Sequence, residues 1–177
     1  QIQAFIHYHF GYTYATEQLA NKLEGLGVDK SWHVLDLCCG WGRHTIPLAE
    51  RGFRMSGLDL SAYHIAIARE SAAKANVDAQ WQVGDMRRLP QADGSFDAVI
   101  NMFTAFGYFD DAENRRILEA IHRALRPRGR VLLELNHGPA LWASFLPCFV
   151  VSRRGEDLVI DQHRHDALSG RLHAQRT

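Results

Sequence analysis

The sequence lacks a strong excess of charge of either sign. Its 177 residues carry 20 basic and 20 acidic side chains, so the formal net charge is zero. A neutral chain argues against a basic nucleic-acid-binding protein and against a polybasic membrane-surface protein. A local group of arginines between positions 115 and 130 is interpreted as a solvated helix face with a cation-rich C-terminal end. We therefore expect no nucleic-acid partner and no membrane partner.

Cysteines and long hydrophobic runs are also scarce. The three cysteines, Cys38, Cys39 and Cys148, form neither a disulfide framework nor the spacing of a zinc site. Free cysteines suit a reducing compartment, so we expect a cytoplasmic protein without a metal. The longest apolar stretch, near 139–151, is far short of the roughly 20 residues that cross a bilayer. The first residues lack the charged and then apolar pattern of a signal segment, so we expect none in this sequence.

What the chain does contain is enough apolar material for a folded domain. Hydrophobic residues make up 46% of the sequence and charged ones 23%, which is ordinary for a globular protein and too apolar for a disordered one. The length predicts one domain or slightly more. The chain begins at Gln1 without a methionine, so we expect it to be part of a longer polypeptide.

Segments typical of strands and helices alternate from about residue 13 to 136. This alternation predicts βαβ units and a parallel sheet, and therefore an α/β fold. Ser61 and Asp110 are typical helix caps. The expected strands are 32–37, 54–58, 80–83, 96–102 and 130–135, and the expected helices are 16–26, 43–51, the segment after Ser61, and 111–125.

The pattern changes after the fifth strand. Residues 139–146 read as a short helix, and 148–176 as three strands of antiparallel character. We expect a core domain over 1–147 and an antiparallel β appendage over 148–177, which contacts either the ligand-binding side of the core domain or a second copy in a homodimer. Strand 130–135 should present an exposed edge, which invites such pairing.

The segment 34–43 carries the most chemical information. A buried strand runs into Gly40 and Gly42 and then into a helix, and the glycines permit positive φ and a close approach to a ligand. The next strand ends in Asp59, where a carboxylate can accept hydrogen bonds from both ribose hydroxyls of an adenine nucleoside. The alternative role for Asp59 is a helix cap beside Ser61.

The charge near this turn indicates which nucleoside binds. A dinucleotide site favours a third glycine where this chain has Thr45. Asp36, at the end of the first strand, would repel a pyrophosphate and attract the ammonium and sulfonium of S-adenosylmethionine. An NAD-dependent oxidoreductase is thereby disfavoured.

These segments together resemble the motifs of the class I S-adenosylmethionine-dependent methyltransferases, densely over residues 32 to about 136. The resemblance implies a doubly wound and mostly parallel Rossmann-like sheet of order 3-2-1-4-5 with helices on both faces. It implies that Val34–Gly42 holds the methionine portion of the cofactor and that Asp59 binds the ribose. It also implies that Asp85 accepts from the adenine amine and that Met86 donates its backbone N–H. The cofactor-binding residues that the resemblance implies are Asp36, Cys38, Cys39, Gly40, Gly42, Asp59, Leu60, Gly84, Asp85, Met86 and Asn101.

Two further stretches, 38–44 and 106–109, are similar to the small-molecule-type bacterial branch of this family. Members of that branch often carry an antiparallel insertion after the fifth strand. Residues 148–176 match such an insertion, which we expect on the methyl-acceptor side or at a dimer contact. Members of the fold normally continue with strands that close the sheet, and we expect these to be missing here, so that this fragment could be inactive.

Methyl transfer to a small-molecule acceptor is an in-line displacement with a neutral leaving thioether, so alignment of the acceptor supplies most of the rate. A base is needed only if the acceptor keeps its proton. His137, at the exit of strand 130–135, is the candidate for acceptor contact or base, with a structural role as the alternative. Tyr108, Tyr8 and Tyr12 are expected substrate contacts, and the N-terminal aromatics predict either a lid or a helix-packing patch.

The motifs leave a second function open, a non-catalytic S-adenosylmethionine-binding module. Cys38 and Cys39 are interpreted as small packing residues, since neither has an obvious base nearby. The exit of strand 96–102 lacks the Asn/Asp-Pro-Pro-Tyr/Phe run of amino-methylating nucleic-acid enzymes, which agrees with the zero net charge.

Overall fold

The computed structural model describes residues 3–9, 16–90, 92–136, 138–143, 145–154 and 157–177. The chain divides into two compact units, 1–136 and 137–177. The division falls before the short helix α5 (Gly138–Ala143), rather than at the 147/148 boundary expected from the change of sequence pattern. Aromatic contacts explain this, because the Trp142 ring lies 4.0 Å from that of His165 and the Phe145 ring 6.4 Å from that of His163.

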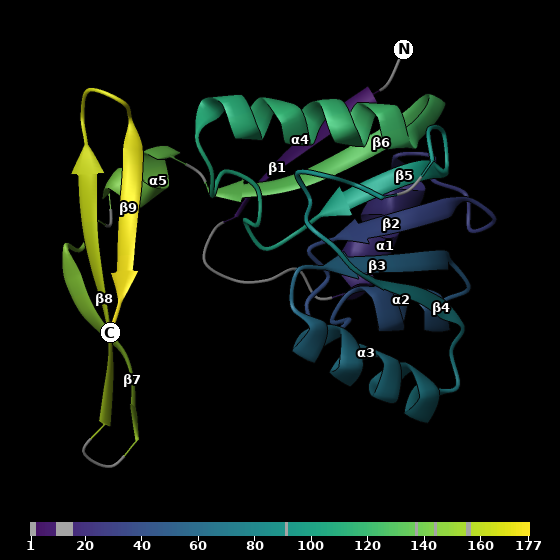
Figure 1. The fold of residues 1–177 in the computed structure, drawn as a ribbon, viewed down its shortest axis with the longest axis horizontal. Helices are drawn as coiled ribbons and strands as arrows, with labels where there is room; N and C mark the ends of the chain where they lie inside the picture. The colour runs from purple at the N-terminus through teal and green to yellow at the C-terminus, as the bar shows by residue number, and fades with distance from the viewer. Residues whose placement is uncertain (1–2, 10–15, 91, 137, 144, 155–156) are drawn as a thin grey trace. The chain divides into compact units, whose positions relative to one another are not determined.

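A six-stranded parallel sheet forms the centre of the first unit (Figure 1). The strand order is β1-β6-β5-β2-β3-β4. Counted from β2, this order contains the 3-2-1-4-5 arrangement, which confirms the fold prediction. The strands are β1 (Gln3–His9), β2 (His33–Leu37), β3 (Arg54–Asp59), β4 (Ala79–Val83), β5 (Phe96–Asn101) and β6 (Leu125–Asn136).

β1 corrects two expectations about the N-terminal segment. It pairs in parallel with β6, with Gln3 opposite Arg130 and Tyr8 opposite Leu135. The edge of β6 that we expected to be exposed is therefore covered, and Phe5 and Tyr8 belong to a strand rather than to a lid or a helix-packing patch. The physical reason is that an edge strand offers unpaired N–H and C=O groups, which a segment rich in β-forming residues can satisfy. Tyr12 lies outside the described residues.

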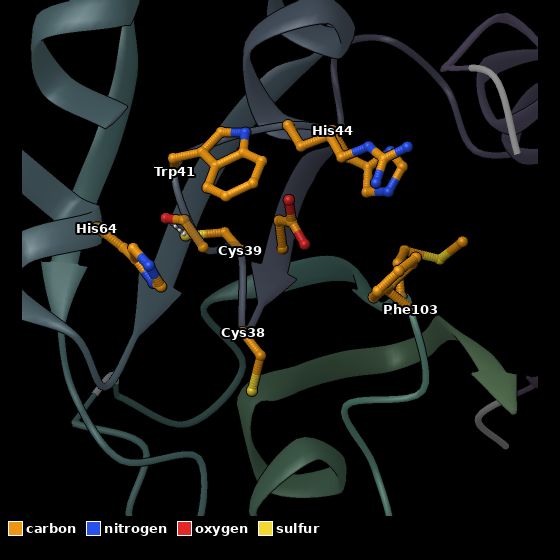
Figure 2. Close-up of a pocket in the computed structure, with 10 residues that line it drawn as sticks. Cys38, Cys39, Trp41, His44, His64 and Phe103 are labelled. Carbon is orange, nitrogen blue, oxygen red and sulfur yellow. Dashed lines mark hydrogen bonds between the residues drawn. The ribbon is translucent and has the colours of Figure 1, made fainter. Parts of the chain in front are cut away.

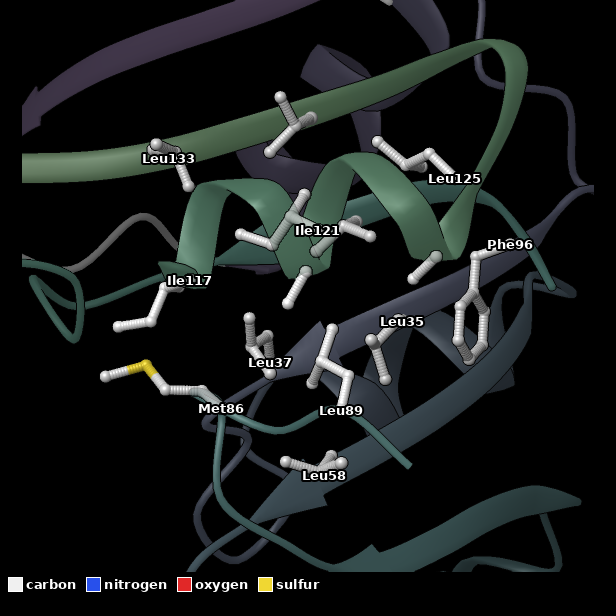
Figure 3. Close-up of a cluster of buried hydrophobic side chains, with 14 residues drawn as sticks. Leu35, Leu37, Leu58, Met86, Leu89, Phe96, Ile117, Ile121, Leu125 and Leu133 are labelled. Carbon is white, nitrogen blue, oxygen red and sulfur yellow. The ribbon is translucent and has the colours of Figure 1, made fainter. Parts of the chain in front are cut away.

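Helices cover both faces of this sheet. No helix among the described residues is long and apolar enough to cross a membrane. On one face, α4 packs Ile117 and Ile121 against Leu35 and Leu37 of β2 (Figure 3). On the other face, Leu19 of α1 and Leu48 of α2 lie in one apolar cluster with Val34 of β2. β2 is thus buried on both sides, which explains its continuous apolar sequence. The helices are α1 (Thr16–Gly25), α2 (Thr45–Glu50), α3 (Ala62–Ala75) and α4 (Asp111–Ala124).

Two helix starts follow the expected capping chemistry. The Ser61 hydroxyl accepts the N–H of His64 at 3.2 Å, and Asp110 Oδ1 accepts the N–H of Glu113 at 2.8 Å. Each cap satisfies one of the backbone donors that a helix start leaves unpaired. The cap on α3 fixes the turn that directly follows β3.

The second unit confirms the three antiparallel strands predicted for residues 148–176. β7 (Cys148–Arg154), β8 (Asp157–Asp166) and β9 (Arg171–Arg176) form a sheet in chain order. The Arg176 guanidinium donates to both oxygens of Asp161, each at 2.7 Å, across β8 and β9.

The indole of Trp81, from β4, packs tightly against the glycine-containing turn. A Cβ on Gly57 of β3 would lie 2.7 Å from Trp81 and 2.8 Å from the Sγ of Cys39. A Cβ on Gly42, whose φ is +85°, would lie 2.6 Å from the same indole. The missing side chains therefore let the turn after β2 rest directly on β3 and β4.

We predict that Gly57→Ala lowers the free energy of unfolding by about 1–3 kcal/mol, because the added methyl overpacks this contact. Urea denaturation followed by circular dichroism measures the change. The matched control is Gly25→Ala at the end of α1, where a Cβ has nothing within 4 Å and alanine favours the helix. Equal stability of the Gly57→Ala and unaltered proteins would contradict the tight packing.

Candidate functional site

A cavity of about 240 Å³ lies at the carboxyl ends of β2 and β5, beside that of β3, and is also lined by His64 of α3 (Figure 2). This edge is where open parallel sheets bind ligands, and β2 and β5 flank the point at which the strand order reverses. Four residues expected from the motifs, Asp36, Cys38, Cys39 and Gly40, line the cavity. The other lining residues are Trp41, Arg43, His44, His64, Met102 and Phe103.

The turn after β2 has left-handed backbone at Cys38, Gly40 and Gly42, with φ values of +67°, +56° and +85°. The Cys38 N–H donates to the carbonyl of Leu58 at 2.8 Å, which fastens the turn to β3. Burial raises the pKa of the Cys38 thiol to about 12 and also raises that of Cys39. Both thiols stay protonated at neutral pH, so neither acts as a nucleophile.

Asp36 is a buried carboxylate in the cavity wall, with 2% of its surface exposed. The Thr45 hydroxyl donates to its Oδ2 at 2.6 Å. Burial raises the pKa of Asp36 to about 6, and the neighbouring charge of Asp59 adds to the rise. A cationic ligand group beside Asp36 would offset this burial cost.

Asp59 joins the turn after β2 to the start of α3. Its Oδ2 accepts the N–H of Gly40 and its Oδ1 accepts the N–H of Ser61, each at 2.9 Å. His64 Nδ1 lies 3.8 Å from Oδ1. The capping alternative therefore describes real contacts of Asp59. Each carboxylate oxygen has two acceptor positions, so capacity for a ligand hydroxyl remains.

Asp85 is engaged by an arginine that the sequence did not single out. Arg87 donates from Nη2 and from Nε to Asp85 Oδ2 at 2.6 and 3.0 Å, and from Nη1 to Glu113 of α4 at 2.7 Å. Its guanidinium lies 4.4 Å from the centre of the Phe109 ring. The hydrogen bonds from Arg87 hold the pKa of Asp85 below its usual value. A ligand amine at Asp85 would share this carboxylate with Arg87.

Seven expected cofactor residues do not line the cavity, namely Gly42, Asp59, Leu60, Gly84, Asp85, Met86 and Asn101. Leu60 is 69% exposed, whereas Met86 is buried and its Sδ lies 3.4 Å from the Sγ of Cys38. The N–H of Gly84 donates to the carbonyl of Asp59 at 2.9 Å. The buried amide of Asn101 donates to the carbonyl of Leu37 at 2.8 Å.

The expected acceptor contacts are only partly described. Tyr108 is 76% exposed and is not among the residues that line the cavity. Tyr8 lies in β1, where only the backbone is described. His137 and Tyr12 lie outside the described residues. Among the described residues, no group of three or more His, Cys, Asp or Glu side chains could hold a metal ion.

Sequence reasoning missed Phe103, which has a left-handed backbone with φ +57°. Its N–H donates to Oε2 of the buried Glu134 on β6 at 2.8 Å, and the next N–H, of Thr104, donates to the Glu134 carbonyl at 3.2 Å. This shape depends on a glutamate distant in sequence, so no local signal predicts it. His44 and His64 did carry local signals, since one follows the glycine turn directly and the other lies in the first turn of α3.

The site lies at the switch point of a doubly wound sheet, and Asp36 and Asp59 stand at the ends of the neighbouring strands β2 and β3. This arrangement is typical of nucleoside-binding α/β proteins. Comparison with known proteins narrows the class. The methyltransferase domain family matches residues 34–129. The chain belongs to this family, among the class I S-adenosylmethionine-dependent methyltransferases, as its motifs indicated.

Individual relatives agree with this assignment. An uncharacterised methyltransferase of Synechocystis sp. is 36% identical over 126 residues, which are 71% of this chain and 57% of the relative. A demethylmenaquinone methyltransferase of Deinococcus radiodurans is 33% identical over 131 residues, 65% of this chain and 53% of the relative. The chain thus spans just over half the length of these curated relatives.

A solved structure shows the shared fold. It is the S-adenosylmethionine-bound amino pentose methyltransferase of Micromonospora echinaspora. Its TM-score is 0.67 at 24% identity, over 92% of this chain and 73% of that one.

We predict that Asp36→Asn raises the free energy of unfolding at pH 7.5 by about 1–3 kcal/mol, since each pKa unit corresponds to about 1.4 kcal/mol. The folded-state pKa is about 6 against an ordinary 3.8, so the folded protein binds the proton more tightly than the unfolded chain. Its stability therefore falls as the pH rises between these two values and levels off above them.

Urea denaturation at several pH values tests this expectation. The stability gap between Asp36→Asn and the unaltered protein should be small at pH 4 and largest above pH 6. The matched control is Asp78→Asn, at an exposed position before β4, which should show little gap at any pH. A gap of the same size at every pH would contradict the raised pKa.

Proposed function

We propose that this protein binds S-adenosylmethionine in the cavity at the ends of β2 and β5, beside that of β3, and transfers its methyl group to a small molecule. The observation that carries the proposal is the Asp59 carboxylate at the end of β3, held 2.9 Å from the N–H of Gly40. It stands beside a cavity that also contains the buried Asp36. Membership of the methyltransferase domain family supports the same reading.

The residues of the site fit this cofactor by charge and shape. Asp36 is an anion with a burial cost that the ligand's ammonium and sulfonium would offset. Because Gly42 and Gly57 have no side chains, the turn after β2 packs directly on Trp81. Gly40 also has no side chain, so its backbone can approach a ligand closely. Asp59 would accept from the ribose hydroxyls, Asp85 from the adenine amine, and the Met86 N–H would donate to the adenine ring. Cys38, Cys39, Leu60, Gly84 and Asn101 complete the proposed cofactor-binding residues.

S-adenosylmethionine supplies an electrophilic methyl group whose leaving thioether is neutral, so no protein acid is needed at sulfur. The chain contributes by holding the cofactor's charged end at Asp36 and its ribose at Asp59, which leaves alignment of the acceptor as the main source of rate. His137 is proposed as acceptor contact or base, and Tyr8, Tyr12 and Tyr108 as acceptor contacts. A base acts only if the acceptor carries a proton up to the transition state.

The acceptor is proposed to be a small molecule rather than a nucleic acid. The Deinococcus radiodurans relative is described as a demethylmenaquinone methyltransferase, and the zero net charge of the chain disfavours binding to phosphate backbones. We propose a cytoplasmic location because the three cysteines are free, as suits a reducing compartment. We also propose that the β7-β8-β9 unit is an acceptor-side or homodimer contact.

We predict that Asp59→Ala weakens the binding of S-adenosylhomocysteine at least tenfold, because one or two hydrogen bonds to a charged acceptor are lost, each worth roughly 1.5–3 kcal/mol. Isothermal titration calorimetry measures the affinity. The control is Asp78→Ala. Asp78 directly precedes β4 and so lies at the amino-end edge of the sheet, opposite to the edge that carries Asp59. Unchanged affinity in Asp59→Ala would remove the ribose assignment.

A ligand comparison separates the proposed function from its alternatives. S-adenosylmethionine should raise the melting temperature of the protein, and NAD should not, because Asp36 repels a pyrophosphate. Stabilisation by NAD alone would support an oxidoreductase. Cofactor binding without methyl transfer across a panel of small acceptors, in the longest native chain, would support a non-catalytic module.

A further inference from the structure

His44 is a buried histidine in the cavity wall whose ring nitrogens have no partner. Only 6% of its surface is exposed. Within the part of the chain that the structure describes, neither Nδ1 nor Nε2 makes a hydrogen bond. A buried polar group without a partner costs free energy, and native structures contain few of them. The described residues therefore leave both ring nitrogens available to a ligand.

The ring is held as a neutral imidazole. Burial lowers the pKa of His44, and the charge of Arg43 lowers it further, while Glu134 acts in the opposite direction. A neutral imidazole has one N–H donor and one acceptor nitrogen. It can donate a hydrogen bond to an anionic ligand atom without adding a second cation to the cavity.

The position of His44 indicates which part of the cofactor it meets. Figure 2 shows His64 at one side of the cavity, and His44 and Phe103 at the other. His64 lies beside Asp59, 3.8 Å from its Oδ1, which is the proposed ribose end. His44 is therefore at the end away from the ribose, where the amino-acid part of the cofactor would lie.

The charges in the cavity wall select an amino-acid group at that end. Asp36 is buried and acidic, and Arg43 is a cation whose guanidinium lies 5.5 Å from the centre of the Phe103 ring. A group carrying both an ammonium and a carboxylate complements this pair. Asp36 suits the ammonium, which leaves the carboxylate as the acceptor available to a His44 N–H.

We propose that His44 is a positioning residue for the methionyl end of the cofactor: a ring N–H donates to the ligand's α-carboxylate while Asp36 accepts from its α-ammonium. This inference rests on the proposed function. It adds a residue that fixes the cofactor by its amino-acid group, and so makes the site prefer ligands that carry that group.

The test compares two ligands by isothermal titration calorimetry. S-adenosylhomocysteine carries the amino-acid group, and 5′-methylthioadenosine lacks it. We expect His44→Phe to weaken S-adenosylhomocysteine about tenfold or more, the scale of one lost hydrogen bond to a charged group, and to leave 5′-methylthioadenosine unchanged. His44→Gln, which keeps a donor, should recover part of the preference.

The melting temperature of the ligand-free His44→Phe protein gives a second readout. If His44 had a structural role, the substitution would lower this temperature. Replacing an unpartnered buried imidazole with an apolar ring removes a desolvation cost, so the ligand-free His44→Phe protein should melt at an equal or higher temperature. The matched control is His64→Phe, which should change the affinity for both ligands by the same factor because it lies at the ribose end.

The outcomes distinguish this inference from the proposed function. Failure of the unaltered protein to bind either ligand overturns the proposed function and the role of His44 with it. Normal binding with an unchanged ligand preference in His44→Phe overturns only the role of His44. Equal weakening of both ligands, or loss of the preference in Arg43→Gln but not in His44→Phe, also overturns it.

Discussion

The Asp59 carboxylate holds together the parts of the chain between which the cavity opens. One oxygen accepts the N–H of Gly40 in the turn after β2, and the other accepts the N–H of Ser61 at the start of α3. Hydrogen bonds to a charged acceptor are stronger than neutral ones. Because both act from the end of β3, the turn and the helix keep their places relative to the sheet. The shape of the cavity therefore depends on this side chain.

Around that anchor the protein accepts polar groups that a purely structural core would avoid. Asp36 is a carboxylate with 2% of its surface exposed, and His44 is an imidazole whose nitrogens lack partners among the described residues. Burial of the apolar clusters on both faces of the sheet stabilises the fold and offsets the free-energy cost of these polar groups. Such locally unfavourable groups are typical of binding sites, where the ligand completes the interactions.

Much of the fold was predictable because its signals are local. The alternation of strands and helices, and the caps at Ser61 and Asp110, involve residues close together in sequence. β1 was not predictable in this way, because its pairing with β6 joins residues more than a hundred positions apart. The boundary after Asn136 likewise depends on Trp142 meeting the His165 ring.

The sequence by itself determined where Asp36, Gly40 and Asp59 would stand, because each is tied to the end of a strand and parallel strands end at one edge of the sheet. Only the tertiary structure decided what those side chains and their neighbours contact. Arg87 donates hydrogen bonds to Asp85 and to Glu113 of α4, and Glu134 accepts the backbone N–H of Phe103. The contacts of Arg87 with Glu113 and of Phe103 with Glu134 join segments far apart in the sequence, so their geometry exists only once the sheet has formed.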